Sequence, residues 1–328
     1  MGDKSPTVLQ QIGRQIAEAS RILIITHVAP DGDAIGSLLG LGRLLEAQGK
    51  QVTLACEDAV PEIYAWLPGS QEVVRQGDGA YDLVISLDCS DRRRMGRVYS
   101  DSLASRPLIN IDHHVTNTNF GTLNWVDPDS VAAAQIVLTL AEGLGWEVDE
   151  DTAVCLLTGL VTDSRSFRTS NVDAAAVRAA LRLMEAGASL SEVTSRTLEQ
   201  RPLASVRLWG EAIEALHLED GILWTTVSHE MRRRWNLNGD SFSGLANFLS
   251  GVREAQVVIV FTERDDGTVD VGMRSVPGCD VSRIALRLGG GGHPQAAGCT
   301  LSGDLKEIER SVLAEVRRGL AEQRLEKT

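Results

Sequence analysis

The first half of the chain alternates short apolar runs with longer segments of helical spacing, and this alternation restricts the fold most. Arg21–Thr26 is an apolar run with β-branched residues, so it is predicted to be a buried strand. Ala34–Gly49 then repeats apolar residues at helical spacing and closes on glycine. Further strands are predicted at Gln51–Cys56, Asp82–Leu87 and Pro107–Ile111, and further helices at Ser130–Leu144, Thr152–Thr162 and Asn171–Ala188. The pattern favours the α/β class, with a mostly parallel sheet covered by helices.

The pattern changes at Ser189–Pro202, which is polar and charged and ends in an Arg-Pro pair. A chain of 328 residues suits two cores. We therefore predict a first domain over residues 1–190, a linker over 191–204 and a second domain over 205–328. The second part should hold helices at Leu203–Leu216, Val281–Leu288 and Leu305–Gln323 and strands at Ile222–Val227, Gln256–Thr262 and Thr268–Arg274. That content predicts a smaller α+β domain.

Residues of metal-binding type follow three of the predicted strands. They are His27, Asp31 and Asp33 after the first, Asp88 after the third, and Asp112, His113 and His114 after the fourth. Ligands of open α/β sheets bind at the carboxyl ends of the strands, so these side chains should meet at one edge. Asp163 adds a carboxylate at the end of an apolar helix, where the helix dipole disfavours it.

The residue types suit two divalent cations. Mg²⁺ and Mn²⁺ prefer carboxylate oxygens, and Mn²⁺ also accepts imidazole. Two such ions can clamp a phosphoryl group, and they need several carboxylates, one of them bridging. Taken singly, the motifs have simpler explanations: Asp31 could make an Asx-turn, and Asp88 could cap a helix. Their convergence on one sheet edge favours a metal site.

The sequence also resembles a known family. Asp112-His113-His114 is similar to the signature of the DHH phosphoesterase superfamily, and the segment from His27 to Asp33 resembles its first motif. Asp88-Cys89-Ser90 resembles the second motif, and Thr162-Asp163-Ser164 with Phe167 the fourth. Near the C-terminus, the run from Gly289 to Gly298 resembles the glycine-rich motif of the companion DHHA1 domain. In its length and in the segment HHVTNTNFG, the chain resembles the NrnA-like group of bifunctional oligoribonucleases and pAp phosphatases.

The resemblance implies a division of the ligands between two ions. One ion would be held by His27, Asp31 and Asp88, and the other by Asp33, Asp88, His113 and Asp163. His114 would contact the scissile phosphate, and Asp112 would orient the neighbouring histidines. Catalytic roles would thus fall to Asp88, Asp112, His113 and His114. Two Mn²⁺ ions are expected, with Mg²⁺ as the alternative.

The second domain would bind the substrate. Backbone amides of Gly290, Gly291 and Gly292, with His293, could cradle a phosphate or nucleotide end. A flexible turn would explain the glycines as well. Arg274 could pair with a terminal phosphate, or it could be a solvated arginine at a strand end. Asn247 and Arg253 are weaker candidates for the same cleft.

Composition limits the partners. The formal net charge of −13 argues against a protein that grips long duplex nucleic acid, because such proteins are usually basic. Short oligonucleotides or small nucleotides fit better, with a metal site and a few arginines to attract them. Five scattered cysteines, the absence of a long apolar run, and a start at Met1–Ser5 unlike a secretory signal predict a cytoplasmic protein without a membrane partner. A homodimer is compatible with the sequence.

Together these features predict an enzyme that hydrolyses short oligoribonucleotides to nucleoside monophosphates and pAp to AMP. The enzymatic alternative is a phosphodiesterase for cyclic-di-AMP or linear dinucleotides. Two further classes are a nucleotide sensor that lost its metals, which predicts gaps in the ligand set, and a family II-type pyrophosphatase, which ends in a different second domain.

Overall fold

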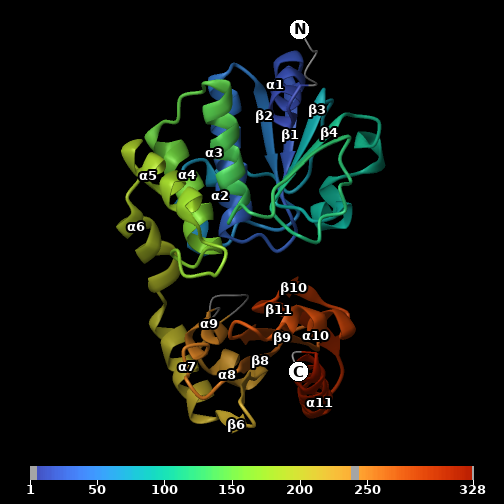
Figure 1. Ribbon diagram of the computed structural model, residues 1–328, viewed down its shortest axis with the longest axis vertical. Helices are drawn as coiled ribbons and strands as arrows, with labels where there is room; N and C mark the ends of the chain where they lie inside the picture. Colours follow the sequence, from blue (N-terminus) through green and yellow to red (C-terminus); the bar gives the residue numbers. More distant parts are fainter. Residues whose placement is uncertain (1–5, 238–243, 327–328) are drawn as a thin grey trace. The chain divides into compact units, whose positions relative to one another are not determined.

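The computed structural model describes residues 6–237 and 244–326 (Figure 1). Met1–Ser5, on which the expectation about a secretory signal depended, lie outside the described residues. The chain divides into two compact units, the first ending at Gln200 and the second beginning at Arg201. Across the described ranges, no helix combines the length and apolar character that crossing a membrane requires.

The first unit is built on a five-stranded sheet in which every strand pairs in parallel with its neighbour. Its order is β2-β1-β3-β4-β5, from strands β1 (Arg21–Ile25), β2 (Gln51–Ala55), β3 (Leu83–Leu87), β4 (Leu108–Asp112) and β5 (Leu123–Val126). This confirms the predicted parallel sheet. Only β5 was missed, because its four residues are partly exposed and too short to show a pattern.

Helices cover the sheet of the first unit (Figure 1). They are α1 (Val8–Glu18), α2 (Gly32–Ala47), α3 (Ala133–Leu144), α4 (Glu150–Asp163), α5 (Ala174–Glu185) and α6 (Leu190–Thr194). Short helices η1 (Glu62–Tyr64), η2 (Ser70–Glu72), η3 (Arg92–Val98) and η4 (Asp101–Leu103) lie in the connections. The largest core joins the helices to the sheet, and a smaller one joins Met95, Val98 and Leu103 to β1 and β3.

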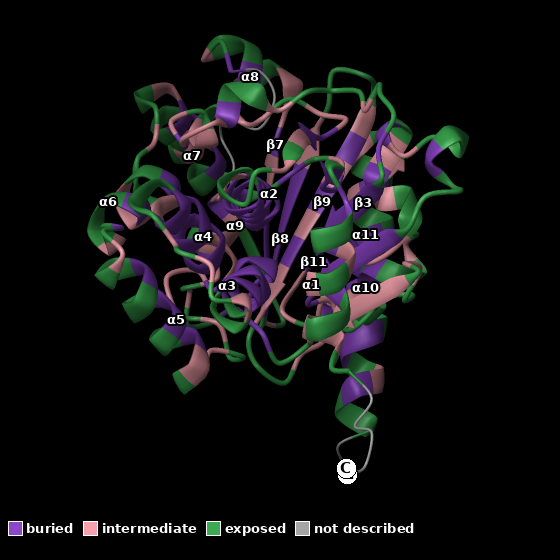
Figure 2. Ribbon diagram, turned by 90° about the horizontal axis from the view of Figure 1, so that it is seen from above, coloured by how far each residue is buried: buried purple, intermediate pink, exposed green. Residues whose placement is uncertain are grey.

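Two helices of this unit approach each other very closely. A Cβ on Gly36 of α2 would overlap the backbone of α4 at Cys155 and Gly159. Glycine is required there because only its missing side chain lets the two backbones meet. The consequence is functional, since Asp33 lies in the first turn of α2 and Asp163 ends α4. Further out, α5 turns Ala176, Ala180 and Leu183 inward and alternates buried with exposed residues (Figure 2).

The second unit contains a six-stranded mixed sheet of order β10-β11-β9-β8-β7-β6. Its strands are β6 (His217–Glu219), β7 (Ile222–Val227), β8 (Val257–Glu263), β9 (Thr268–Ser275), β10 (Gly291–His293) and β11 (Ala296–Ser302). Its helices are α7 (Leu203–Glu214), α8 (His229–Arg234), α9 (Leu245–Leu249), α10 (Val281–Arg287) and α11 (Leu305–Leu325). One core packs α10 and α11 on the sheet and another packs α7 and α9, which confirms a second domain of mixed sheet and helices.

The segment predicted as a linker, residues 191–204, is largely helical. It contains the end of α6, the π-helix η5 (Ser195–Glu199) and the start of α7. Arg196 lies over the Trp66 ring at 4.8 Å, and the Thr197 hydroxyl donates to the Val193 carbonyl at 2.7 Å. Polar composition predicts a connector, but these contacts hold the residues up to Gln200 on the first unit, and the segment passes into the second unit at Arg201.

Candidate metal centre

The order of strands in the first sheet reverses between β1 and β3. The chain passes from β1 to β2 on one side and returns to β3 on the other. Such a switch point opens a crevice at the carboxyl ends of the two strands. His27 follows β1 and Asp88 follows β3, and His27 Nε2 lies 3.3 Å from Asp88 Oδ2 and 3.8 Å from Asp31 Oδ1. The first three predicted ligands therefore meet at this crevice.

Asp88 occupies an unusual position. Its backbone φ is +57°, in the left-handed region that is costly for most side chains. It is 2% exposed, and its Oδ1 atom is buried without a hydrogen-bond partner. Burying a carboxylate oxygen without a hydrogen bond costs free energy of folding unless another group interacts with it. A cation would do so.

The remaining three predicted ligands gather on the other side of Asp88. His113 Nε2 lies 3.5 Å from Asp88 Oδ1, 3.4 Å from Asp163 Oδ2 and 3.9 Å from Asp33 Oδ2. The His113 ring is held from behind, since its Nδ1 lies 3.2 Å from the Ser130 carbonyl oxygen. Metal-binding histidines commonly use the second ring nitrogen in this way.

Asp33 has a structural task that the sequence did not predict. Helix α3 begins at Ala133 without a side-chain cap from Ala132. Asp33 accepts hydrogen bonds from the amides of Ala133 at 2.5 Å and Ala134 at 3.0 Å, so it caps α3 from another element. The same contacts fix its carboxylate where it faces His113.

The Asp112 carboxylate supports both histidines that follow it. Its Oδ1 accepts from the His113 amide at 2.8 Å and lies 2.8 Å from His114 Nδ1. Its Oδ2 accepts from Asn117 Nδ2 at 2.5 Å, and Asn117 also donates to Asn110 Oδ1 at 2.8 Å and to the Cys89 carbonyl at 3.0 Å. Asn117 therefore holds the carboxylate that orients His114. Asn117 stands within the segment HHVTNTNFG, and nothing local in the sequence predicts its contact with Asp112.

The two ligand histidines carry protons when no cation is present. Burial lowers the pKa of His27, but hydrogen bonds and charges from Asp31 and Asp88 outweigh it and raise the pKa to about 10. Burial also lowers the pKa of His113, while Asp88 and Asp163 raise it well above the ordinary value. These imidazoles act as counter-charges for the carboxylates.

Burial and neighbouring charges also shift the pKa values of the carboxylates in this cluster. Burial raises the pKa of Asp163 to about 7, although the charge of His113 opposes the shift. Burial and the Asp88 charge raise the pKa of Asp33 well above its usual range. Burial would also raise the pKa of Asp88, but the facing imidazoles of His113 and His27 hold it far below its usual range. Without cations, protons on the histidines and on some of the aspartates offset the negative charge that divalent cations would otherwise balance.

The donor set fits divalent cations. Ligand atoms of His27, Asp31 and Asp88 lie within 4.8 Å of one another, and those of Asp33, His113 and Asp163 do so as well. Asp88 forms a further group with His113 and His114, so it adjoins both clusters. Carboxylate oxygens with a few imidazoles suit Mn²⁺ and related ions. The residues of this edge can therefore hold metal.

A strained turn fixes the end of α4 beside Asp163. Arg165, Ser166 and Phe167 all have φ between +50° and +61°. The Ser164 hydroxyl bonds the Leu160 carbonyl and accepts from the Phe167 amide at 2.9 Å, which stabilises the turn. Consecutive left-handed residues of this kind are uncommon outside functional sites.

In the second unit, the glycine run forms a helix end and a strand instead of an open loop. The amides of Gly289 and Gly290 bond the carbonyls of Leu286 and Ala285 at the end of α10, so they do not face a ligand. Gly291 and Gly292 enter β10, which pairs with β11. Because β10 is the edge strand, one side of its backbone lies open.

Arg274 and His293 lie on one row of the second sheet. Ala296 pairs with Arg274 of β9 on one side and with His293 of β10 on the other. Residues in direct register point to the same face, so a small alanine separates the two polar side chains. Arg274 Nε donates to Asn247 Oδ1 at 2.6 Å, which joins a third predicted residue to the row. Within the described ranges, the candidate Arg253 makes no hydrogen bond or ion pair with this row.

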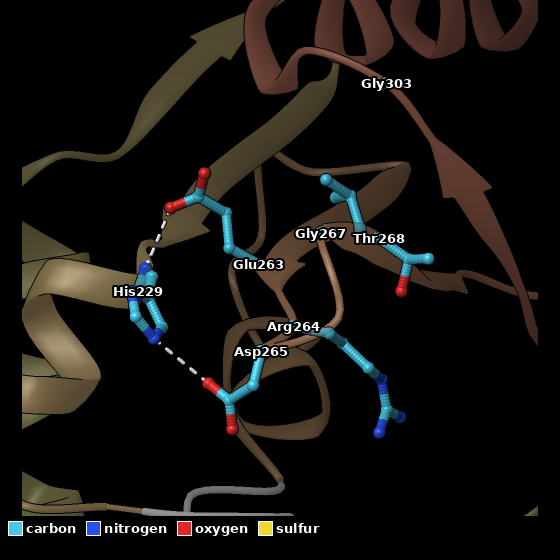
Figure 3. A pocket seen from close by; sticks show the side chains of 8 residues that line it. His229, Glu263, Arg264, Asp265, Gly267, Thr268 and Gly303 are labelled. Carbon is cyan, nitrogen blue, oxygen red and sulfur yellow. Dashed lines mark hydrogen bonds and ion pairs between the residues drawn. The ribbon is translucent and has the colours of Figure 1, made fainter.

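A separate hollow lies at the turn between β8 and β9 (Figure 3). None of the predicted site residues lines it. Its His229 Nε2 lies 3.1 Å from Asp265 Oδ1, and the His229 amide donates to Glu263 Oε2 at 2.8 Å. Arg232 donates to the Glu263 carbonyl at 2.6 Å. These charges satisfy one another and stabilise the turn.

Comparison with known proteins gives the family. The model of the DHH family, N-terminal domain, matches residues 21–160, and that of the DHHA1 domain matches residues 222–321. The bifunctional oligoribonuclease and PAP phosphatase NrnA of Thermus thermophilus is 38% identical over 304 residues, covering 91% of this chain and 90% of that protein. The chain belongs to the DHH family.

Two further proteins are similar to this chain. The cyclic-di-AMP phosphodiesterase GdpP of Geobacillus thermodenitrificans is 27% identical over 306 residues, which cover 88% of this chain but 45% of that protein. An exopolyphosphatase-related protein from Bacteroides fragilis has the same fold, with a TM-score of 0.88 at 22% identity and 98% of each chain covered. This DHH protein thus shares its two-domain fold along nearly its whole length.

Proposed function

We propose that this DHH protein is a two-metal phosphoesterase that hydrolyses short oligoribonucleotides to nucleoside monophosphates and pAp to AMP. The observation that carries the proposal is Asp88, whose buried Oδ1 lacks a hydrogen-bond partner between two groups of candidate ligands. The similarity to the Thermus thermophilus oligoribonuclease and PAP phosphatase supports the choice of substrate.

The ligands divide as the family resemblance implies. His27, Asp31 and Asp88 would hold one ion, and Asp33, Asp88, His113 and Asp163 the other, with Mn²⁺ as the preferred ion and Mg²⁺ as the alternative. Bound there, two divalent cations supply Lewis acidity toward a phosphoryl oxygen and lower the pKa of a bound water.

His114 supplies charge from the protein itself. Its Nδ1 lies 2.8 Å from Asp112 Oδ1, and its Nε2 would donate toward a phosphate oxygen. Burial lowers the pKa of His114, but the Asp112 hydrogen bond and the Asp88 charge raise it above the ordinary value. A protonated imidazole in this position would stabilise negative charge that develops on the scissile phosphate.

The second unit would bind the nucleotide end of the substrate. Arg274 and His293 flank Ala296, and a phosphate there would accept charge-assisted hydrogen bonds from both. The open edge of β10 at Gly291 and Gly292 allows close approach of a base or sugar, because no side chain blocks it. The protein would act as a cytoplasmic enzyme on small nucleotides.

A substrate panel tests the proposal. Purified protein with Mn²⁺ is given pApA, longer oligoribonucleotides, pAp, cyclic-di-AMP and pyrophosphate side by side, and products are resolved by chromatography. We expect AMP from pApA and pAp at the highest rates. The likeness to GdpP makes cyclic-di-AMP the second candidate, and its preferential hydrolysis would replace the proposed substrate.

Matched variants identify the site. Asp88→Asn should abolish hydrolysis of every substrate, whereas Asp101→Asn, at an exposed carboxylate of η4, should not change it. If Asp88→Asn retained Mn²⁺-dependent activity, the proposed centre would be wrong.

A further inference from the structure

Phe248 is an aromatic side chain that the second unit leaves exposed. It lies in α9 and is 62% exposed, whereas Leu245 and Leu249 of the same helix are buried in the core that joins α9 to α7 and the sheet. Among the large apolar side chains exposed within residues 6–237 and 244–326, it is the single aromatic one. The core therefore fixes the helix in place but does not account for Phe248.

The Trp209 ring lies next to Phe248. Trp209 belongs to α7, which packs beside α9 in the second unit (Figure 1), and the two ring centroids are 5.8 Å apart with 34° between the ring planes. The Arg201 guanidinium lies over the Trp209 ring, 6.0 Å from its centroid. Aromatic pairs at this separation attract each other, so the Phe248 ring has a preferred position before any ligand arrives.

Polar groups that suit a phosphate adjoin this aromatic pair. Asn247 immediately precedes Phe248 and accepts from Arg274 Nε at 2.6 Å, and Arg274 shares a row of the sheet with His293. One short helix thus carries an aromatic ring and, at the preceding residue, the partner of the arginine proposed to bind phosphate. Because a single sugar joins the base of a nucleotide to its phosphate, neighbouring side chains can bind both ends.

A nucleobase matches this surface in shape and in charge. Bases stack on aromatic side chains and on arginine guanidinium groups, and every base offers a π-face for this. Arg201 and Arg274 bring positive charge close to the two rings, in a chain whose formal net charge is −13. Positive charge beside an exposed aromatic ring favours an anionic aromatic ligand over an apolar protein surface.

We propose that Phe248 is a stacking platform for the base of the nucleotide whose phosphate binds at Arg274. The inference rests on the proposed phosphoesterase function, and it adds a residue that none of the family motifs quoted above contains. Stacking requires a flat ring and no particular pattern of hydrogen bonds, so the platform accepts every base. That property suits an enzyme for short oligoribonucleotides of mixed sequence.

Binding of AMP and of ribose 5-phosphate to the Mn²⁺-loaded protein, measured by calorimetry, tests the proposal. The two ligands share the sugar and the phosphate, so the ratio of their affinities isolates the contribution of the base. In the unaltered protein, AMP should bind roughly 10- to 100-fold more tightly than ribose 5-phosphate. Phe248→Ala should lower the affinity for AMP to that of ribose 5-phosphate and leave the affinity for ribose 5-phosphate unchanged.

Further variants separate stacking from simple apolar contact. Phe248→Trp offers a larger flat ring and should keep the preference for AMP, whereas Phe248→Leu keeps an apolar side chain and should lose most of the preference. Leu218→Ala is the matched control, because it removes an exposed apolar side chain from β6, at the edge of the sheet opposite β10. It should change neither affinity.

Three results would overturn the inference. The first is an unaltered protein that binds the two ligands equally or binds neither, and the second is a Phe248→Ala variant that keeps the preference for AMP. The third is a Phe248→Ala variant that keeps the preference but loses self-association in sedimentation, which would make the exposed ring an interface with a second copy of the chain.

The two proposals fail in different ways. If the unaltered protein hydrolyses the panel and Phe248→Ala keeps the preference for AMP, only the role of Phe248 is wrong. If Phe248→Ala loses that preference but the unaltered protein hydrolyses no substrate, only the proposed function is wrong. If the Mn²⁺-loaded protein binds neither ligand and hydrolyses nothing, both are wrong.

Discussion

His27 Nε2 faces Asp88 Oδ2 at 3.3 Å across the point where the first sheet reverses its strand order. Asp88→Asn keeps the size of the side chain and removes the charge that both candidate ion positions share. We expect Mn²⁺ affinity to fall by at least about 100-fold while the fold is retained. Calorimetry with Mn²⁺ and circular dichroism measure the two effects. Unchanged Mn²⁺ affinity would show that Asp88 is not a ligand.

Mn²⁺ binding should release protons. His27 has a pKa of about 10 and Asp163 of about 7 without a cation, so at neutral pH His27 is protonated and Asp163 partly so. Both must lose those protons to coordinate, and therefore apparent Mn²⁺ affinity should rise with pH from about 6 to 9. Titration in buffers of different ionisation enthalpy counts the protons. An affinity independent of pH over this range would contradict the assignment of these ligands.

Asn117 should position His114 through Asp112. Asn117→Ala removes the donor to Asp112 Oδ2, so the carboxylate is free to turn away from His114. We expect kcat to fall roughly 10- to 100-fold with little change in KM, and the pH–rate profile of kcat to shift. Thr116→Ala, at an exposed residue next to it, serves as the control. A purely structural role would lower thermal stability but leave the pH profile unchanged.

Two neighbouring glycines should respond differently to alanine. A Cβ on Gly290 would overlap the Gly298 carbonyl, so Gly290→Ala should destabilise the second unit by about 1–3 kcal/mol. Gly291 is exposed with nothing within 4 Å of a Cβ, so Gly291→Ala should change stability by less than about 0.5 kcal/mol. If the edge of β10 binds substrate, Gly291→Ala raises KM alone. Denaturant titrations measure the stability of both variants, and steady-state kinetics measure KM. An unchanged KM in Gly291→Ala would show that β10 does not bind substrate.

Arg274 should contribute to substrate binding together with Asn247. Arg274→Ala should raise KM for pAp roughly 10- to 100-fold, since a charge-assisted contact is lost, with kcat less affected. Asn247→Ala should raise it less, because it only orients the guanidinium at 2.6 Å. The double variant should resemble Arg274→Ala, and additive effects would mean that the two residues act independently. Arg283→Ala, at an exposed arginine of α10 that pairs with Glu326 at 2.8 Å, is the control.

The sheet edge was predictable because strand ends and ligand chemistry are both local in sequence. His27, Asp88 and His113 follow apolar runs, and a parallel sheet brings such positions together whatever its strand order. The order itself, which places β1 beside β3, follows from packing between distant segments and has no local signal. Helix α1 was not predicted, although Ile12 and Ile16 recur at helical spacing and Thr7 caps its first turn.

Residues that act through partners were not predictable. Asn117 gains its role from Asp112 and Cys89, and Asp33 gains its capping role from a helix that starts 100 positions later. Arg94 is one of three consecutive arginines, and only the fold shows that its Nη2 lies 2.9 Å from His27 Nδ1. The glycine run was expected to be a loop that offers its amides, but its first two amides close α10 instead.

The six candidate ligands all come from residues that precede Gln200, whereas the row containing Arg274 and His293 comes from residues that follow it. With the proposed roles, catalysis and choice of substrate would be encoded in separate stretches of the gene. Substitutions in the later stretch would then change which nucleotide is accepted without changing the residues proposed to hold the ions. Such a division gives this architecture an evolutionary freedom, because new specificities can arise on an unaltered hydrolytic module.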